Sequence, residues 1–554
     1  MIARQREIWR NWLRKNWPFW LYLGLALLIL GPLLKPGYLF LLDWSEVPGH
    51  WFNWRTCEIP QVVNCLALQF LRFLLGWLVS GAVWQKILLV AIFTLTGFSM
   101  FAVLPRDLGI IPRVLAGIFY LVNPFVYQRF LAGHIGFLLG YAILPWAVFA
   151  LFQAFRQSSN RHLVVAALWW TLATVFSVHY IFIVGTVFLA TLAVLLVTHR
   201  QRAGEILITA GKFLGWWGVF NAFWFLPLAF TAGSAGEINW SHFWAYRPAE
   251  DTRWGLLINL LGMYGFWRER TTTEILLTKD YLVFWPFFLV LLLVPAGIGI
   301  RQLIREGRFR FLTVVLLVAI LSLLLSTGGA DTFWQKVIHW LFLYLPGFKI
   351  MRESQKFLAL LVLVYSILIA WGFKAIASWR AQFVVGTAVC GFLVLLGLYN
   401  FLLFWGAGGQ LSVREYPASW IKAKQIVESD YGDFQILILP WQLYVVNHPL
   451  AQWRTIADPA PRFFYPQQVL ACRHPQIAGV TFLETSRERK IRELLSRPDP
   501  SLWQKTLSSI GVKYIFAHRF VGDRTPQIYG LLKQSPQFSL LVEDEFAGLF
   551  KVAQ

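Results

Sequence analysis

The chain has 554 residues, of which 57% are hydrophobic and only 14% are charged. Soluble globular proteins carry about 25% charged residues, so the composition excludes that class and indicates an integral membrane protein. The formal net charge of +21 fits basic cytoplasmic loops and a surface that meets anionic membrane lipids. No basic and aromatic nucleic-acid-binding module stands out, so we expect no nucleic acid partner.

Five basic residues between Arg4 and Lys15 precede the first apolar run at about 18–35. By the positive-inside rule the N-terminus is cytoplasmic, and the loop that follows the run is external. No small-residue cleavage site follows the run, so we expect no cleaved signal peptide. Residues 62–81 are apolar but contain Arg72, which predicts an interfacial or re-entrant helix, with a true span as the alternative.

Apolar runs of about 20 residues predict the remaining spans, because that length crosses a bilayer. The run at 163–198 is longer and has basic residues at both ends, which indicates two short spans with a tip near Ser177–Tyr180. We expect a second interfacial helix near 334–347. The predicted bundle of about eleven spans comprises 18–35, 84–104, 109–127, 135–155, two within 163–198, 207–230, 281–300, 311–327, 357–376 and 383–405.

The basic clusters agree with one topology. All of them fall on the cytoplasmic side, as the positive-inside rule requires. The mixed-charge loops at 36–83 and 231–280 fall outside, and we expect the substrate site there. The cytoplasmic clusters lie near 1–15, 106–113, 156–161, 199–202, 301–310 and 374–380.

The composition changes after residue 405. A membrane domain of residues 1–405 is followed by residues 406–554, which are charged and rich in proline. We expect them to form an extracytoplasmic α/β or α+β domain. Its predicted elements are buried strands at Phe434–Pro440 and Val512–Ala517, helices at 415–428 and 484–496, and a strand-rich end that begins at Tyr529–Lys533.

The four cysteines do not suggest a metal. Cys57 and Cys65 share the first external loop and either form a disulfide or stay unbonded. Cys390 lies in an apolar run and Cys472 in the C-terminal part. Their spacing fits no zinc pattern, so we predict no metal site.

Two carboxylates lie just beyond the first apolar run, Asp43 and Glu46 in the segment Leu41–His50. Acids at the edge of a membrane helix are costly unless they have a role. A carboxylate at this place can take a proton from a substrate hydroxyl. We interpret Asp43 as a general base that Glu46 supports from one helical turn away. The alternative is two solvated loop acids, one of which caps a short helix.

Arg129 and His134 flank an external turn, and His179 lies at the tip of the 163–198 run. The guanidinium of an arginine suits a phosphate, because its donors can bind two oxygens at once. We therefore predict that Arg129, His134 and His179 bind substrate. The alternatives are an arginine that reaches to the membrane interface and histidines that are ordinary polar side chains.

Arg352 and Lys356 open the span at 357–376 and, at i and i+4, would share a helix face. Cations at a helix N-terminus add to the positive end of its dipole, which favours an anionic ligand. We predict that this pair also binds substrate. The alternative is an internal ion pair with Glu353 or with the 231–280 loop.

Several motifs are absent from the sequence. It contains no Walker A loop, no Rossmann glycine fingerprint and no HExxH. These absences argue against ATP-driven transport, nucleotide-sugar chemistry on a soluble fold and zincin proteolysis. The predicted spans also carry few ionisable residues at mid-membrane, which disfavours an ion-coupled transporter.

With an acid in the first external loop and a C-terminal domain outside, the layout resembles the GT-C superfamily of integral membrane glycosyltransferases. Three segments resemble its arabinofuranosyltransferase-related and YfhO-like members. These segments are Asn123–Trp146, Arg352–Phe357 and Gly511–Ile515.

This resemblance implies transfer of a sugar from a polyprenyl phosphate to an extracytoplasmic glycan, lipid or protein. It implies that Asp43 is the base and that Glu46 lies beside it. It also implies that the protein is located in the cell membrane. Some members use a divalent metal bound by a DxD-type pair, but here the spacing is Asp43-Trp44-Ser45-Glu46. That departure favours the metal-independent members, so we expect no cofactor.

Two other functions stay open at this stage. One is a lipid or polysaccharide flippase or export component without catalytic activity. The other is a structural membrane protein whose C-terminal domain binds a partner in the cell envelope.

Overall fold

The computed structural model describes residues 2–48, 62–76, 78–230, 238–270, 275–379, 381–464, 468–472, 485–497, 499–519 and 525–553. These residues form two compact units. The membrane unit comprises the described residues of Met1–Gly31, Trp54–Gln69 and Ile87–Gln410. The C-terminal unit comprises those of Pro32–Asn53, Phe70–Lys86 and Leu411–Gln554. The segment that carries Asp43 therefore belongs to the C-terminal unit.

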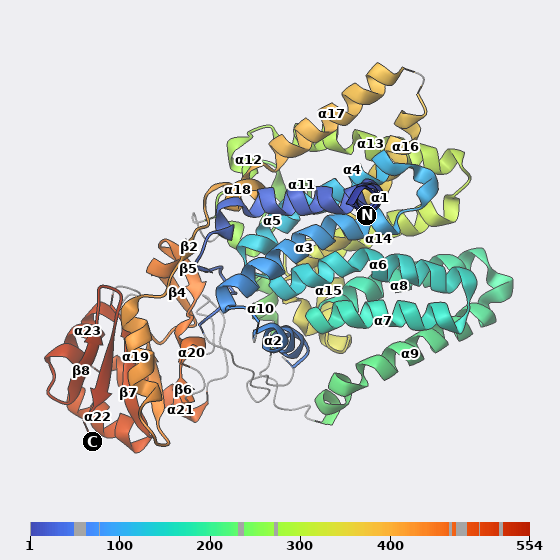
Figure 1. Cartoon of the computed structure of the whole chain (residues 1–554). Helices are drawn as coiled ribbons and strands as arrows, with labels where there is room; N and C mark the ends of the chain where they lie inside the picture. Colours follow the sequence, from blue (N-terminus) through green and yellow to red (C-terminus); the bar gives the residue numbers. More distant parts are fainter. Residues whose placement is uncertain are drawn as a thin grey trace. The chain divides into compact units, whose positions relative to one another are not determined.

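Long helices build the membrane unit, and α6, α7 and α9 lie side by side in it (Figure 1). Ten helical segments of the described residues are long and apolar enough to cross a bilayer. The chain is thus a multi-pass membrane protein. We predicted about eleven spans, and the difference is α7, whose 17 residues are at the lower limit for a crossing.

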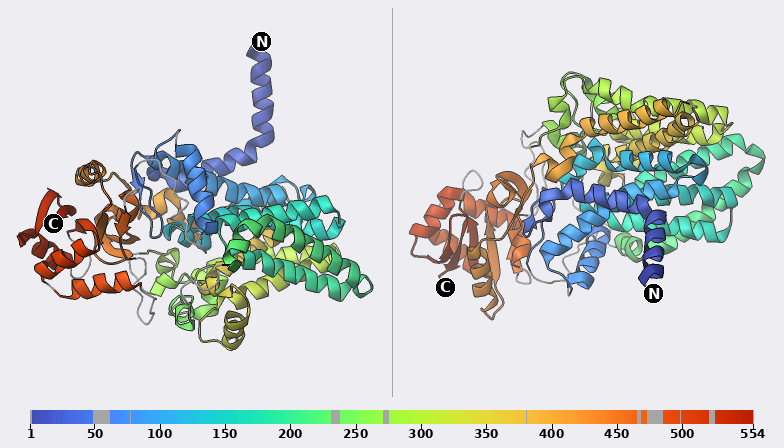
Figure 2. Two further views of the ribbon diagram at one scale, coloured as in Figure 1. Left: turned by 90° about the horizontal axis from the view of Figure 1, so that it is seen from below. Right: turned by 45° about the horizontal axis from the view of Figure 1, so that its top comes forward.

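The long helices agree closely with the predicted runs. Figure 2 shows that α1, which contains Pro18, is bent. The bounds of the long helices, with the short α5 that completes the span begun by α4, are α1 (Ile2–Leu30), α3 (Gly81–Val103), α4 (Ile110–Leu121), α5 (Pro124–Leu131), α6 (Ile135–Gln157), α7 (Asn160–Phe176), α8 (Tyr180–Thr198), α9 (Ala203–Phe230), α13 (Trp285–Arg305), α14 (Phe309–Ser326), α16 (Leu358–Ala377) and α17 (Gln382–Tyr399).

Shorter helices connect the spans. The predicted non-spanning helices are present as α2, with 15 residues, and α15, with 10. Both are too short to cross a bilayer. Cys57 and the side chain of Cys65 lie outside the described residues. The bounds are α2 (Val62–Gly76), α10 (Trp240–Ala245), α11 (Gly255–Leu261), α12 (Thr278–Tyr281), α15 (Gln335–Tyr344) and α18 (Phe404–Gly408).

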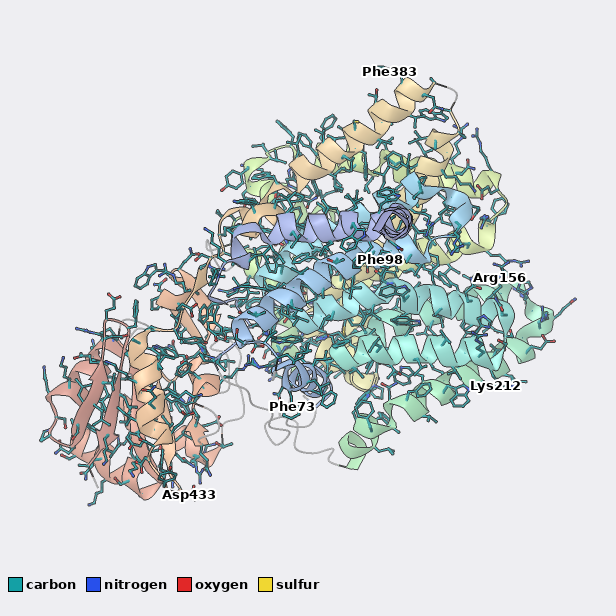
Figure 3. All side chains as sticks on the ribbon, viewed as in Figure 1. Phe73, Phe98, Arg156, Lys212, Phe383 and Asp433 are labelled. Carbon is teal, nitrogen blue, oxygen red and sulfur yellow. The ribbon has the colours of Figure 1, made fainter. Side chains whose placement is uncertain are left out.

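Apolar side chains cover the outside of the bundle. Phe383, on α17, is 86% exposed and points away from the other helices (Figure 3). Val219 and Phe225 on α9 are more than half exposed as well. Exposure of such a surface to water costs free energy, whereas contact with lipid chains does not. Inside the bundle α16 is buried along its length, and a Cβ atom at Gly372 would overlap the carbonyl of Pro295 on α13.

A five-stranded mixed sheet forms the core of the C-terminal unit, in the order β6-β3-β7-β9-β8. Strand β3 pairs in parallel with β6 and β7, whereas β9 pairs antiparallel with β7 and β8. Two smaller pairs, β1–β2 and β4–β5, are antiparallel. The strands are β1 (Tyr38–Leu39), β2 (Val413–Arg414), β3 (Gln435–Leu439), β4 (Tyr444–His448), β5 (Arg454–Ala457), β6 (Gln468–Leu470), β7 (Val512–His518), β8 (Phe538–Glu543) and β9 (Ala547–Val552).

Helices cover both faces of this sheet. Alternate residues of β3 enter different cores, because side chains of a strand point to opposite faces. Ile436 and Ile438 pack with Trp420 of α19, whereas Leu437 and Leu439 join the core that α21, α22 and α23 cover. The predicted α/β character is confirmed. The helices are α19 (Ala418–Glu428), α20 (Ala460–Phe463), α21 (Ser486–Ser496), α22 (Pro500–Ser509) and α23 (Thr525–Gln534).

One predicted element of this unit is wrong. Tyr529–Lys533 does not begin a strand-rich segment but lies inside helix α23. Tyr529 and Leu532, three residues apart, are both buried in the same core, and helical spacing brings such residues to one face. The closing strands β8 and β9 start only at Phe538.

Candidate functional site

Arg129 lies on α5, a short helix that follows directly after α4. The Asn123 side chain caps α5 by accepting the amide of Val126 at 3.0 Å, and Pro124 occupies its first turn. This combination starts a new helix. The helix ends at a turn in which Gly133 has a φ of 70°, a conformation that favours glycine. His134 follows this turn, so Arg129 and His134 come from its two sides.

Arg352 and Lys356 do not share an α-helical face, and that part of the prediction is wrong. They lie in two 3-10 turns, η6 (Phe348–Arg352) and η7 (Ser354–Phe357), which Glu353 separates with a non-helical backbone. The turns are held against α14, because Ser354 Oγ donates to the carbonyl of Ser326 at 2.9 Å. As a result, Glu353 points its carboxylate among residues from several helices.

The predicted cationic residues surround Glu353. Its Oε2 lies 3.2 Å from Arg129 Nη1, 3.4 Å from Lys356 Nζ and 3.9 Å from His134 Nε2. Arg129 Nη1 also lies 3.2 Å from His134 Nδ1. The Arg129 side chain is only 1% exposed, and among the described residues its Nε has no hydrogen-bond partner. We call Arg129, His134, His179, Arg352, Glu353 and Lys356 the Glu353 cluster.

His179 joins this cluster through Lys356. The Lys356 Nζ lies 3.0 Å from His179 Nε2, and Ser177 Oγ lies 2.9 Å from His179 Nδ1. An ammonium group can only donate, so Nε2 accepts from Lys356 and the ring proton lies on Nδ1, toward Ser177. The lysine thus fixes one tautomer of a neutral histidine.

Burial and neighbouring charges shift the pKa of Glu353 and of His179, which lie outside the spans. Burial alone would raise the pKa of the Glu353 carboxyl. The charges of Lys356, His134 and Arg129 lower this pKa by more than burial raises it, so the net pKa is below its usual range. Burial lowers the pKa of His179 well below its usual value, and Lys356 acts in the same direction. Glu353 is therefore ionised and His179 neutral at neutral pH.

A cavity of about 490 Å³ adjoins this cluster, a volume within the range of small-molecule sites. Its charged and polar lining residues are His179, Arg352, Glu353 and Lys356. Its apolar wall is formed by Ile181, Phe182, Trp217, Trp224 and Phe225. The lining thus combines charged groups that can bind an anion with apolar side chains that can contact an attached hydrocarbon chain.

A second buried carboxylate, Glu269, has a different environment. It accepts hydrogen bonds from the amides of Gly265 and Phe266 and from the side chains of Gln128, Asn259 and Lys279. Lys279 Nζ lies 2.8 Å from Glu269 Oε2 and 2.7 Å from Asn259 Oδ1. These groups satisfy one another, so we interpret the Glu269 network as structural.

Asp43 lies at the tip of a small hairpin in the C-terminal unit, where Phe40 bridges Ser45. Its Oδ1 accepts a hydrogen bond from the Tyr444 hydroxyl at 2.6 Å. The amide of Ala457 donates to the carbonyl of Leu42 at 2.7 Å. The β4–β5 pair, which carries Tyr444 and Ala457, therefore orients the Asp43 carboxylate.

Glu46 is not one helical turn from Asp43, because the segment is a hairpin and not a helix. Its carboxylate forms an ion pair with Arg72 of α2, and the two side chains are 11% and 8% exposed. The Tyr416 hydroxyl donates to the Glu46 carbonyl at 2.8 Å, and Arg72 Nη2 donates to the Val47 carbonyl at 3.1 Å. In this arrangement Glu46 supports the hairpin through Arg72.

Sequence analysis missed several members of these sites. The aromatic wall from Trp217 to Phe225 had no signal beyond the apolar run of its helix. Tyr444 lies about 400 residues from Asp43, so no local pattern connects them. Glu353 was considered only as a counterion for Arg352 and Lys356, and its charge between two basic residues was the available signal.

Comparisons with known proteins identify the fold. No family model matches the sequence, and no curated protein matches it. The structure is similar to the arabinofuranosyltransferase AftD from Mycobacteria, with a TM-score of 0.63, 15% identity and coverage of 98% of this chain. A mutant form of AftD gives a TM-score of 0.60 at 15% identity, again over 98% of this chain.

The match covers only 40% and 42% of the two AftD chains, so this chain spans less than half their length. At this identity the similarity establishes the fold and not the activity. The predicted helical bundle of membrane spans with a strand-containing C-terminal region is confirmed, and its fold is similar to that of AftD.

Proposed function

We propose that the protein is a membrane glycosyltransferase that transfers a sugar from a polyprenyl-phosphate-linked donor to an extracytoplasmic glycan, lipid or protein. The single observation that carries this proposal is the cavity beside the Glu353 cluster. Its lining combines cations with aromatic and aliphatic side chains. Such a site matches a phosphate attached to a long hydrocarbon chain.

The wall of the cavity includes α9, whose outer surface is apolar and exposed. Phe225 lines the cavity and is 55% exposed, and Val219 on the same helix is 65% exposed. A helix with this surface faces lipid in a membrane. A lipid chain can therefore reach the cavity from the bilayer without crossing water.

The cations suit the leaving group of the proposed reaction. Arg129, Arg352 and Lys356 outnumber Glu353, the acid at the centre of the cluster. We propose that they bind the donor phosphate, with His134 and His179 beside it, and stabilise the charge that develops on it. Departure of an ionised lipid phosphate needs no general acid, so one base is sufficient.

We propose Asp43 as that base and Glu46 as its support. Asp43 would take the proton of the acceptor hydroxyl while this oxygen attacks the anomeric carbon and the sugar–phosphate bond breaks. A single displacement of this kind inverts the configuration of the sugar. The Tyr444 hydrogen bond holds the Asp43 carboxylate in one orientation. Because Glu46 is paired with Arg72, we propose that this reaction proceeds without a divalent metal.

The topology belongs to the proposal. The N-terminus would be cytoplasmic, and the C-terminal unit, with Asp43, would lie outside the cytoplasm. The basic clusters of the sequence support this orientation through the positive-inside rule.

The test is sugar transfer from polyprenyl-phosphate pentoses and hexoses to added cell-envelope glycan, lipid and protein acceptors, by the purified full chain in lipid vesicles. Asp43→Asn should lower the rate by about 10²- to 10⁴-fold, the usual contribution of a general base. Asp433→Asn is the matched control, because it makes the same change at a surface acid of the same unit and should keep full activity.

Full activity of Asp43→Asn would overturn the role of this residue. Absence of turnover by the wild type with every donor would overturn the proposed reaction. Movement of the intact donor across the vesicle membrane without sugar release would instead identify a flippase.

A further inference from the structure

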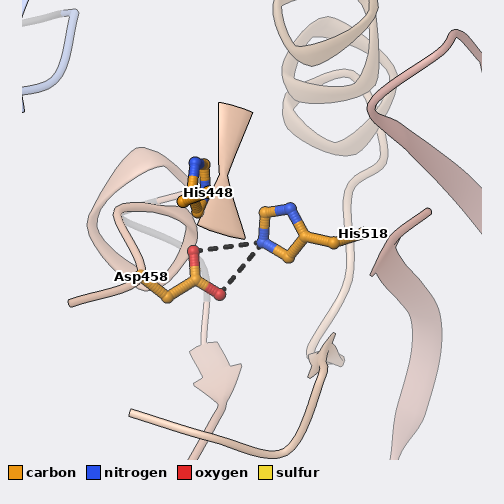
Figure 4. A group of neighbouring side chains, drawn as sticks. All are labelled: His448, Asp458 and His518. Carbon is orange, nitrogen blue, oxygen red and sulfur yellow. Dashed lines mark hydrogen bonds and ion pairs between the residues drawn. The ribbon is translucent and has the colours of Figure 1, made fainter. Parts of the chain in front are cut away.

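Two histidines and an aspartate meet inside the C-terminal unit. His448 ends β4, Asp458 follows β5 and His518 ends β7. One donor atom from each residue lies within 4.8 Å of the other two. Figure 4 shows the three side chains together, with His518 Nε2 at 3.1 and 3.2 Å from the Asp458 oxygens. Among the described residues this is the group whose composition suits a metal ion.

These donors are removed from water. His448 is 0% exposed, and the side chains of His518 and Asp458 are 1% and 3% exposed. Aromatic rings enclose the site, because the His518 ring packs against Trp420 and Phe516. Within the described residues His448 Nε2 has no hydrogen-bond partner. A buried polar atom without a partner is unusual and indicates that a ligand, ion or water completes the site.

We propose that His448, Asp458 and His518 bind a divalent transition metal of the zinc class. Two imidazoles and one carboxylate are ligands that zinc accepts, with an open fourth position. Around zinc, with bonds of about 2.0–2.2 Å, tetrahedral ligand atoms lie about 3.3 Å apart. His518 Nε2 and the Asp458 oxygens already lie 3.1 and 3.2 Å apart, so binding mainly requires His448 to move closer to them. This site is separate from the proposed glycosyl transfer and does not depend on it.

Metal binding has a defined proton balance. For His518 Nε2 to coordinate the ion, its proton, which now bonds Asp458, must move to Nδ1 of the same ring or be released to solvent. His448 Nδ1 accepts the amide of Leu450 at 3.2 Å. Coordination through Nδ1 uses that lone pair, and coordination through Nε2 moves the ring proton to Nδ1. Either way the Leu450 amide loses His448 as its acceptor, and affinity falls at acidic pH.

The site lies next to the hairpin that carries Asp43. Asp458 directly follows Ala457, whose amide donates to Leu42 at 2.7 Å, and its own amide donates to Leu443 at 3.0 Å. Ala457 pairs with Tyr444, which bonds Asp43. A metal at His448 and Asp458 would join β4 to β5 at this point. It is thus a structural ion that stabilises the support of Asp43.

The test uses the full chain in detergent, stripped with a chelator and dialysed against zinc alone. The wild type should retain one equivalent of zinc, measured by mass spectrometry of the metal, and zinc should raise its melting temperature by several degrees. Magnesium should do neither, because it prefers oxygen ligands. Cobalt in place of zinc should give the visible absorption bands of a tetrahedral site, a readout that needs no variant.

Variants separate this site from adventitious surface binding. His518→Ala and Asp458→Asn should lower zinc affinity at least tenfold. His162→Ala, in the membrane unit, should bind zinc as the wild type does. A wild type that retains no zinc and shows no cobalt bands would overturn the proposal. Equal zinc content in the wild type and both ligand variants would overturn it as well, and none of these readouts depends on sugar transfer.

Discussion

Glu269 and Glu353 are two buried carboxylates of the membrane unit, and their surroundings differ. Glu269 accepts hydrogen bonds from two backbone amides, a glutamine, an asparagine and Lys279, and its side chain is 4% exposed. Glu353 is surrounded by Arg129, Lys356 and Arg352, which carry more positive charge than it can balance. Of these two carboxylates, Glu353 is among the described residues that line the cavity of about 490 Å³, and Glu269 is not.

This difference separates a structural network from a binding site. Buried polar groups that satisfy one another stabilise a fold and leave nothing for a ligand. Cations in excess, with the Arg129 Nε unpartnered among the described residues, leave donors that an anion can use. The same residue types thus have two roles, and the balance of charge distinguishes them.

The largest effect should appear when each carboxylate is neutralised. Glu269→Gln and Glu353→Gln should each lower the free energy of unfolding by about 3 kcal/mol, because each removes the nearest counter-charge of a buried cation. Thermal unfolding in detergent measures both losses.

Added inorganic phosphate should then separate the two variants. It should restore much of the melting temperature of Glu353→Gln, because the cavity admits an anion to the cations, and none of that of Glu269→Gln. If phosphate restores the melting temperature of both variants equally, or of neither, the two networks do not differ in the way proposed.

A smaller effect is expected at Lys356. Lys356→Met should weaken binding of a polyprenyl-phosphate sugar by about 10- to 100-fold, the range for loss of a charged hydrogen bond. Its stability should change little, since Arg129 still pairs with Glu353. Titration of the donor against intrinsic tryptophan fluorescence measures the affinity.

Lys349→Met is the matched control for this change. Lys349 lies in η6, close to Lys356 in the chain, but it is exposed and contacts the Phe342 ring. It should bind the donor as the wild type does. The same loss of affinity in both variants would indicate a general effect of charge and not a site at Lys356.

The smallest effect concerns His179 and pH. Its pKa is well below the usual value in the folded protein, so on acidification the unfolded chain takes up a proton that the folded protein does not. Stability should therefore fall as the pH drops below about 6.5, by up to about 1.4 kcal/mol per pH unit. His179→Gln should remove this component from melting temperatures measured between about pH 7.5 and 5.5.

His162→Gln serves as the comparison for this pH series. His162 lies partly exposed in the first turn of α7, next to Ser159, and its replacement should leave the wild-type slope. If His179→Gln keeps the wild-type slope, the Glu353 cluster does not hold this histidine neutral.

Local patterns were sufficient for much of the fold. Runs of apolar residues predicted the spans to within a few residues, as at 357–376 for α16 (Leu358–Ala377), because burial in lipid requires length and hydropathy alone. Strand β7 was equally evident from Val512–Ala517. The prediction failed at α23 because Tyr529 and Leu532 are buried by packing against the sheet, and this packing depends on the tertiary structure.

The candidate site depended on tertiary structure. Sequence chemistry selected Arg129, His134, His179 and Lys356, because such side chains on the predicted external side suit a phosphate. It did not reveal that all four gather around Glu353, since the helix that would have paired Arg352 with Lys356 is broken there.

By itself, then, the sequence determined a polytopic helical membrane protein with a mixed α/β end, because hydropathy and periodicity act over a few turns of chain. Only the tertiary structure decided that Asp43 bonds Tyr444, that Glu46 pairs with Arg72, and that the Asp43 hairpin belongs to the C-terminal unit. The physical reason is distance along the chain. Contacts between residues up to about 400 positions apart are selected by the packing of whole elements, which no local pattern encodes.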